Sequence, residues 1–147
     1  MKLLEVKNLS IDFAAGNRIL SMVDRFSFDV EAGEILALVG ESGCGKSISC
    51  LALTRLLPSP PAIVHAEAIE FHGRGGNVEL ASAPLRQLRK IRGGGIAYIF
   101  QEPAASLNPV FRIGDQIAEV IELHRPEVEN VRAEVIRLLR EVGIPDP

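Results

Sequence analysis

The chain has 147 residues, 47% of them hydrophobic and 24% charged, and a formal net charge of −3. The length fits about one domain, and the weak acidity argues against general electrostatic binding to nucleic acid, whose binding domains carry basic patches. No apolar run approaches the roughly 18 residues of a membrane span, and Glu5 interrupts the start of the chain too early for a targeting signal. Cys44 and Cys50 lack a partner cluster, so they predict neither a disulfide framework nor a metal site. We therefore expect a cytosolic protein without a transmembrane segment of its own.

The first part of the chain predicts strands. Apolar residues alternate along residues 3–13, and a turn is expected at residues 15–17. Residues 26–30 predict a second strand. One face of this second strand is expected to carry Phe26, Phe28 and Val30. Residues 35–39, ILALV, form an unbroken apolar run that is typical of a central buried strand.

The middle of the chain predicts a mixture of helices and strands. The apolar spacing becomes helical over residues 46–57, and the sequence PSPP ends this helix. Residues 66–80 predict a hairpin closed by its glycines, residues 82–91 a short helix, and residues 96–100 another apolar strand. The inward side chains of the short helix are expected to be Leu85, Leu88 and Ile91.

The last part of the chain predicts two helices, separated by Pro126 and ended by Gly143 with Pro145. The apolar face of the first is expected to be Ile113, Ile117, Val120 and Ile121. The apolar face of the second is expected to be Val128, Val131, Val135, Leu138, Leu139 and Val142. The overall pattern is an α/β fold followed by a helical tail.

One motif predicts phosphate chemistry. Residues 40–47, GESGCGKS, fit the pattern G-x-x-x-x-G-K-[ST], with an expected strand before it and an expected helix after it. Its glycines let several backbone N–H groups point at one anion, and the helix start adds partial positive charge. Lys46 supplies a full charge for the outer phosphates, and Ser47 supplies a hydroxyl for Mg²⁺. The expected nucleotide-binding residues of this loop are Gly40, Glu41, Ser42, Gly43, Cys44, Gly45, Lys46 and Ser47.

Two alternatives concern this loop. It could be an ordinary glycine-rich turn between a strand and a helix, and Cys44 could be either a redox group or a tolerated small residue. A GTP-binding protein is not indicated, because no Lys in the chain has an Asp two positions later.

A second sequence stretch indicates which kind of nucleotide-binding protein this is. Residues 96–119, IAYIFQEPAASLNPVFRIGDQIAE, together with the loop resemble the ATP-binding subunit of an ABC transporter of the oligopeptide, dipeptide and nickel importer group. The resemblance covers essentially the whole chain and implies a P-loop NTPase fold of the ABC ATPase type, with ATP and Mg²⁺ as cofactors. It assigns Lys46 and Gln101 to catalysis, and it places Gln101 with Ser47 at the Mg²⁺. The alternative for Gln101 is a polar residue that ends a strand.

The resemblance also implies an adenine contact. Phe13 follows the first predicted strand, where the family places an aromatic side chain that stacks on the base. The alternative is that Phe13 is a core residue at the end of a strand.

Partners and domain boundaries follow from the same resemblance. It implies transmembrane permease subunits, a second ATP-binding subunit in a head-to-tail dimer, and a place at the inner face of the cell membrane. Residues 1–102 would form the nucleotide-binding core, and residues 103–147 the start of a helical subdomain. Coupling to the permease would run through Gln101 and residues 103–113.

Three family elements are not recognised in the sequence: the Ser-Gly-Gly signature, the Walker B strand ending in Asp-Glu, and the switch His. We therefore expect the front part of a longer subunit, inactive in ATP hydrolysis by itself. Two other interpretations remain, namely a non-catalytic remnant with weak or no nucleotide binding, and an ABC-type ATPase that acts on DNA or ribosomes.

Overall fold

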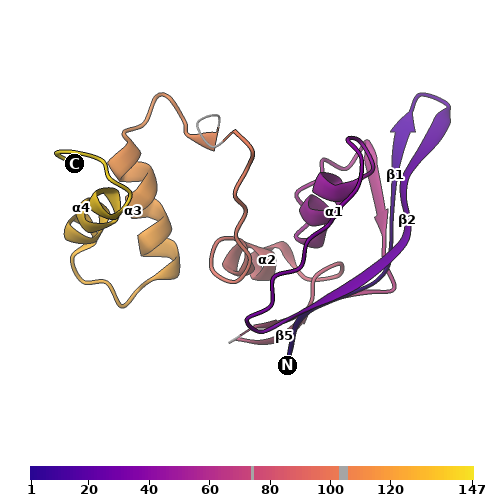
Figure 1. The fold of residues 1–147 in the computed structure, drawn as a ribbon, viewed down its shortest axis with the longest axis horizontal. Helices are drawn as coiled ribbons and strands as arrows, with labels where there is room; N and C mark the ends of the chain where they lie inside the picture. The colour runs from indigo at the N-terminus through magenta and orange to yellow at the C-terminus, as the bar shows by residue number, and fades with distance from the viewer. Residues whose placement is uncertain (74, 103–105) are drawn as a thin grey trace. The chain divides into compact units, whose positions relative to one another are not determined.

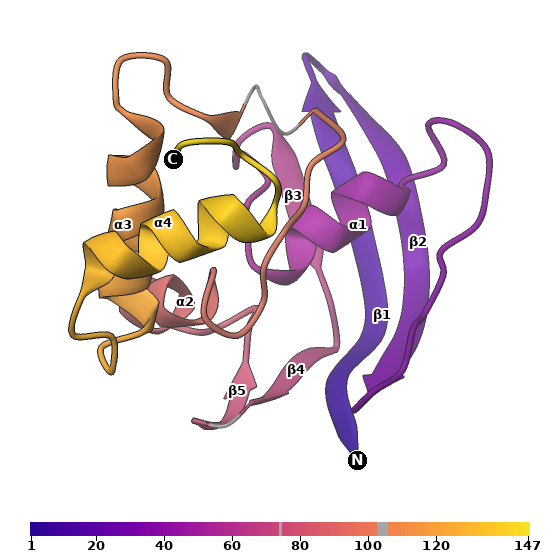
Figure 2. The same cartoon turned by 60° about the vertical axis from the view of Figure 1, so that its left-hand side comes forward.

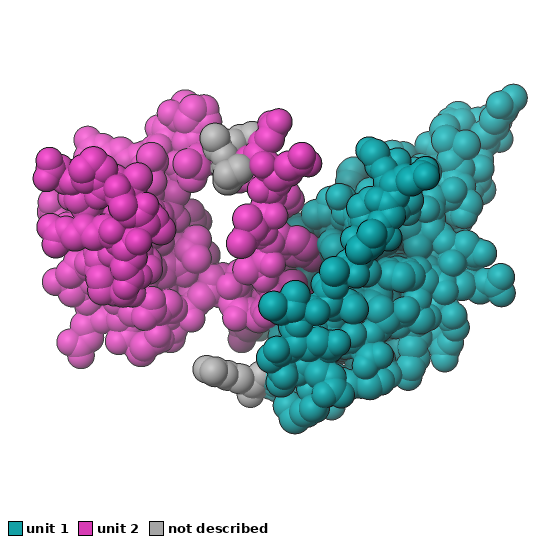
Figure 3. Space-filling view, viewed as in Figure 1, with its two compact units in different colours: residues 1–88 teal, residues 89–147 magenta. Residues whose placement is uncertain are grey.

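The computed structural model describes residues 1–73, 75–102 and 106–147. The chain divides into two compact units, residues 1–88 and residues 89–147, which are coloured separately in Figure 3. The first unit contains the sheet and the first helix, and the second contains the two last helices.

A long antiparallel hairpin forms the body of the first unit (Figure 1). Strand β1 covers Lys2–Ala15 and β2 covers Arg18–Glu31, so Gly16 and Asn17 make the turn between them. Gly16 has a φ of 61°, a left-handed conformation that glycine adopts without a Cβ clash. The first strand was therefore predicted correctly, and the second begins earlier than the expected residues 26–30 because the chain turns back at once.

The other edge of β1 pairs with two strands in succession. β3, Ala62–His65, and β4, Ala68–Gly73, both run antiparallel to β1. β5, Gly76–Glu79, pairs with β4 and completes the predicted hairpin. β3 was missed, because AIVH is too short for a strand pattern to stand out after the proline run.

Asn8 lies where β1 passes from one partner strand to the other. Its φ is 50°, its N–H donates to Ser27 Oγ at 2.8 Å, and its side chain donates to Glu67 Oε2 at 2.7 Å. The register of β1 and β2 shifts between Val6 and Leu9 at the same place. These side-chain partners satisfy a backbone that leaves the regular ladder.

Helix α1, Lys46–Leu53, lies over one face of the hairpin in both Figures 1 and 2. It ends before the predicted Leu57, and Thr54 follows it as a fully buried polar residue. The buried apolar side chains of this unit are Val6, Leu9, Ile11, Ala52, Leu53, Ala62, Ile69, Leu80, Ala83 and Leu88. Helix α2, Leu85–Ile91, buries Leu88 and Ile91 as predicted, but Leu85 is exposed, contrary to the prediction.

The second unit is built on the helix pair α3, Ile113–His124, and α4, Val131–Glu141. Within this helix pair the buried side chains are Ile121 and Val135, whereas Ile113 and Val120 are exposed although they were predicted to lie on the apolar face. Val142 lies beyond α4 and is also exposed. The apolar faces of this pair are thus only partly covered.

Charged groups reinforce the connection between these helices. Asn130 Oδ1 accepts from the Ala133 N–H at 3.0 Å and caps α4. Glu134 accepts from Arg125 Nη1 at 2.6 Å and from Arg137 Nε at 2.7 Å. The hydrogen bonds from Arg137 and Arg125 lower the pKa of Glu134 to about 2.

Two predicted strands do not form. Residues 35–39 have no regular structure, and residues 96–100 contribute only an isolated bridge between Ile96 and Arg92. Ile35 is 96% exposed and Ile99 is 98% exposed. The physical reason is that a strand needs hydrogen-bonding neighbours, and the ladders among the described residues include neither segment.

Candidate nucleotide-binding site

The site begins where the chain enters α1. Gly45 is the N-cap with φ 96° and ψ −2°, and its carbonyl accepts from the Ser49 N–H at 2.9 Å. No side chain in the described part of the chain caps this helix start. The first N–H groups of α1 therefore have no side-chain acceptor, which is the arrangement that binds anions at helix N-termini.

The Lys46 ammonium closes over the same loop. Its Nζ donates to the carbonyl oxygens of Gly40 at 2.8 Å and Glu41 at 2.6 Å, and it lies 3.4 Å from Cys44 Sγ. An ammonium has three donors and no acceptor, so a phosphate oxygen could replace one of these carbonyls without leaving a buried charge unpaired. Lys46 is half-buried, so the charge is held at the loop and remains accessible.

The two outer glycines of the motif lie close to neighbouring atoms. A Cβ on Gly45 would lie 2.7 Å from Val23 Cγ2 and 3.1 Å from the Met22 carbonyl oxygen. A Cβ on Gly40 would lie 2.7 Å from Cys44 Sγ. The loop is thus folded tightly on itself and pressed onto β2, and a side chain at Gly45 would move it away from the sheet.

A cavity of about 500 Å³ lies between β2, residues 37–39 and the start of α1. Lys46 and Ser49 contribute polar groups to its wall. The remaining lining residues are Met22, Val23, Asp24, Phe26, Ala37, Leu38, Val39, Cys44 and Gly45. The cavity wall therefore combines apolar side chains with the Lys46 ammonium, the Ser49 hydroxyl and the Asp24 carboxylate.

The other predicted site residues have less defined surroundings. Ser47 is the second residue of α1 and is exposed. Phe13 is half-buried within β1, where it pairs with Leu20 and Ala62, and it does not line the cavity beside the loop. Gln101 is exposed and belongs to the second unit. Of the expected coupling segment, residues 103–105 lie outside the described residues.

The comparison with protein families settles the family. The model of the ABC transporter family matches residues 23–147. The chain belongs to this family. The predicted partial α/β fold of the ABC ATPase type is also confirmed by a solved structure, because the dimeric post-hydrolysis ATP-binding cassette MJ0796 bound to ADP and Pi aligns with a TM-score of 0.74. That alignment covers 97% of this chain and 58% of the solved chain, at 18% identity.

Curated members of the ABC transporter family are much closer in sequence. The glutathione import ATP-binding protein GsiA of Pectobacterium atrosepticum is 45% identical over 99% of this chain, and the uncharacterized ABC transporter ATP-binding protein YejF of Escherichia coli K12 is 46% identical over 97%. GsiA of Shigella flexneri is 43% identical over 97% of the chain. The chain spans about a quarter of the length of these relatives, namely 24%, 26% and 23%.

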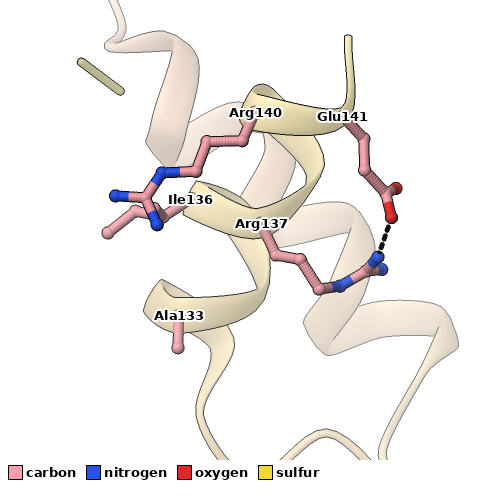
Figure 4. A pocket seen from close by; sticks show the side chains of 5 residues that line it. All are labelled: Ala133, Ile136, Arg137, Arg140 and Glu141. Atoms are coloured by element: carbon pink, nitrogen blue, oxygen red, sulfur yellow. Dashed lines mark hydrogen bonds and ion pairs between the residues drawn. The ribbon is translucent and has the colours of Figure 1, made fainter. Parts of the chain in front are cut away.

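The rest of the described chain was also compared with the requirements of a metal site and of a membrane span. In the described part of the chain, no three His, Cys, Asp or Glu side chains come together in a way that could hold a metal ion. A hollow along α4 is lined by Ala133, Ile136, Arg137, Arg140 and Glu141. Figure 4 shows Arg137 and Glu141 turned toward each other, and they form an ion pair. None of the described helices is long and apolar enough to cross a membrane.

The sequence analysis did not predict two sets of contacts: those that support the phosphate loop and those of the Gln116 side chain. Met22 and Val23 form the surface that supports the loop, a role that depends on the β2 register and leaves no local signal. Gln116 makes side-chain hydrogen bonds to the backbone of residues 108–111. Its position just after a predicted helix start, downstream of an Asn-Pro pair, was the available signal.

Proposed function

We propose that this chain is the MgATP-binding part of the ATP-binding subunit of an ABC-type peptide importer. The observation that carries the proposal is the Lys46 ammonium held over a tight loop at the open N-terminus of α1. This combination supplies a full charge and several N–H donors at one point, which suits the outer phosphates of a nucleoside triphosphate.

In this proposal each predicted site residue contacts one part of the nucleotide or its magnesium ion. The N–H groups of residues 43–47 surround the phosphates, and Lys46 neutralises the outermost ones. The residues present fit a magnesium ion, because Mg²⁺ prefers oxygen ligands and combines a protein hydroxyl with phosphate oxygens, and Ser47 presents such a hydroxyl at the loop. When bound, the ion would neutralise charge on the phosphates. Gln101 is proposed as the second group at the ion, and Phe13 as the adenine contact.

The peptide substrate and the partners are proposed from the relatives. One is named for glutathione import, and glutathione is a peptide. The proposed partners are permease subunits in the membrane and a second ATP-binding subunit, with this chain at the cytoplasmic face. Residues 1–102 are proposed as the nucleotide-binding core and residues 103–147 as the start of the helical subdomain.

One observation favours a second candidate, a chain that binds nucleotide weakly or not at all. Val39 directly precedes the loop and is 92% exposed, and Ile35 is exposed as well. The segment that leads into the loop is thus not held in a sheet, so binding would have to order it at a cost in free energy.

A calorimetric titration distinguishes the two candidates. We expect Lys46→Ala to weaken ATP binding by about 1.5–3 kcal/mol, the contribution of a hydrogen bond to a charged group, and to affect AMP less because AMP lacks the outer phosphates. Lys90→Ala is the matched control, since Lys90 is an exposed cation of α2. Equal losses for ATP and AMP would remove the role of Lys46, and no heat with either nucleotide would favour the second candidate.

The same preparation tests hydrolysis. We expect no phosphate release above that of Lys46→Ala, because phosphoryl transfer to water needs a positioned water and charge stabilisation, and the sequence contains no recognised Asp-Glu strand or signature. Turnover that Lys46→Ala abolishes would show that these 147 residues contain a group able to activate water.

A further inference from the structure

The chain makes a tight glycine turn directly after α2. Gly93 has a φ of 86°, and its N–H donates to the Ile96 carbonyl oxygen at 2.9 Å. The N–H groups of Gly95 and Ile96 donate to the carbonyl oxygen of Ile91, the last residue of α2, at 2.8 Å and 2.9 Å. The turn is therefore fixed to the end of α2 and leads directly into residues 96–101.

The His124 ring lies against this turn. A Cβ on Gly93 would lie 2.8 Å from His124 Nε2, and a Cβ on Gly94 would lie 2.9 Å from His124 Nδ1. Non-bonded heavy atoms pack at about 3.5–4.0 Å, so the ring occupies the space that side chains at both positions would need. All three residues belong to the second unit. The contact thus joins the end of α3 to the turn after α2.

The position of His124 is fixed from the other side as well. His124 is the last residue of α3 and is half-buried. The next residue, Arg125, donates its N–H to the Ile121 carbonyl oxygen at 2.7 Å and its Nη1 to Glu134 of α4 at 2.6 Å. These bonds hold the backbone at the end of α3 in place. The imidazole therefore connects the helix pair to the glycine turn.

The glycine turn begins the segment that ends at Gln101. Apart from the bridge between Ile96 and Arg92, residues 96–100 join no strand ladder among the described residues. A segment without ladder bonds keeps more backbone freedom, and fixing one of its ends reduces that freedom. The contact at His124 fixes the end of the segment that precedes Gln101 in the chain.

We propose that His124 is a positioning residue for Gln101, because its ring holds the Gly93–Gly94 turn and so fixes the start of the segment that carries Gln101. The inference rests on the proposed function and deepens it by naming a residue that acts through Gln101. A group held in place before binding loses less entropy when it binds. Loss of the ring should therefore weaken the part of ATP binding that depends on Mg²⁺, and it should leave the phosphate contacts of Lys46 unchanged.

The first experiment tests the contact by a double-mutant cycle in thermal unfolding. The atoms nearest to a Cβ on Gly93 all belong to His124, whereas a Cβ on Gly143, at a similar φ of 80° in the same unit, has no atom within 4 Å. We expect Gly93→Ala to lower the Tm by about 2–8 °C more than Gly143→Ala in the wild type. In the His124→Ala background the two substitutions should have equal effects. The same excess in both backgrounds, or no excess in the wild type, would overturn the proposal.

The second experiment follows the turn locally by amide hydrogen exchange. The Ile96 N–H reports on the turn, because it donates to the Ile91 carbonyl oxygen. We expect it to exchange about fivefold faster or more in His124→Ala. Leu123→Ala is the matched control, since Leu123 is its exposed neighbour on α3, and His124→Phe should restore slow exchange because a flat ring fills the same space. Unchanged exchange in His124→Ala would overturn the proposal.

The third experiment measures by calorimetry how much Mg²⁺ strengthens ATP binding. We expect His124→Ala to reduce this gain about threefold or more, as Gln101→Ala does, with the ATP affinity in EDTA unchanged. The double variant should lose no more than Gln101→Ala, and Leu123→Ala and His124→Phe should keep the wild-type gain. A wild-type gain in His124→Ala, or losses that add in the double variant, would overturn the proposal.

These results are distinguishable from a failure of the proposed function. If Lys46→Ala weakens ATP binding but Gln101→Ala leaves the Mg²⁺ gain unchanged, the positioning role is overturned and nucleotide binding stands. If the wild type binds no ATP, the proposed function fails and the positioning role fails with it, whereas the unfolding and exchange comparisons still decide whether His124 holds the turn.

Discussion

Strand β1 and residues 35–39 are both apolar, yet only β1 forms a strand. β1 has hydrogen-bonded neighbours along both edges, and it buries Val6, Leu9 and Ile11 completely. Residues 35–39 are in no ladder of the described residues, and Ile35 and Val39 face solvent. The difference shows that an apolar sequence favours burial, but that a segment becomes a buried strand only where a neighbouring strand supplies its hydrogen-bond partners.

The two apolar segments that do not form strands lie next to the predicted nucleotide-binding residues. Residues 35–39 lead directly into the phosphate loop at Gly40, and residues 96–100 lead directly into Gln101. Both groups of predicted site residues thus follow segments that join no strand ladder among the described residues. Exposed apolar segments of this kind are places where other protein surfaces bind.

The largest expected effect is on the paired strand. We expect Leu9→Ala to lower the free energy of unfolding by about 2–5 kcal/mol, because Leu9 is fully buried and a cavity would remain. Ile35→Ala, in the unpaired segment, should change it by only about 0.5 kcal/mol or less. Urea unfolding of both variants checks this. Similar losses would mean that residues 35–39 are packed in solution.

A smaller effect is expected where the loop meets β2. Gly45→Ala should cost about 1–3 kcal/mol of unfolding free energy, because the residue has a φ of 96° and its new Cβ would lie 2.7 Å from Val23 Cγ2. Gly43→Ala is the control, since Gly43 has a φ of 84° but no atom within 4 Å of the added Cβ. Thermal unfolding should therefore rank Gly45→Ala as the more damaging change. Equal shifts would indicate that the loop does not rest on β2.

A smaller change in stability is expected from removing the N-cap of α4 in the second unit. Asn130→Ala should destabilise α4 by about 0.5–2 kcal/mol, because it removes the side chain that accepts from the Ala133 N–H. Glu129→Ala, at the neighbouring exposed position, is the control. Hydrogen exchange at Ala133 reports the loss locally. If exchange there is unaffected, the cap contributes nothing to α4.

The smallest expected effect depends on pH. The pKa of Glu134 is lowered from 4.5 to about 2 by hydrogen bonds from Arg137 and Arg125. A carboxylate with a depressed pKa contributes stability above its unfolded pKa, and this contribution is lost as pH falls from about 4.5 toward 2. Circular dichroism of the wild type should therefore show a loss of helical stability over that range. Glu134→Gln should flatten this dependence, and identical profiles would exclude Glu134 as its source.

The sequence by itself determined the phosphate loop, because its glycines, Lys46 and Ser47 are fixed by local spacing and their backbone requirements are local. It also determined β1, the hairpin of β4 and β5, and the helices, since each has a periodic pattern or a turn residue at its end. These are properties of neighbours along the chain.

Only the tertiary structure decided which apolar segments became strands, which face of each helix was covered, and what supported the loop. Met22 and Val23 meet Gly45 because β2 has one particular register, and Gln116 meets Asn108 because the chain turns back before α3. Residues 35–39 and 96–100 show the converse, since among the described residues neither segment joins a strand ladder despite its apolar pattern. The physical reason is that burial and ladder hydrogen bonds are contacts between distant parts of the chain, which no local pattern encodes.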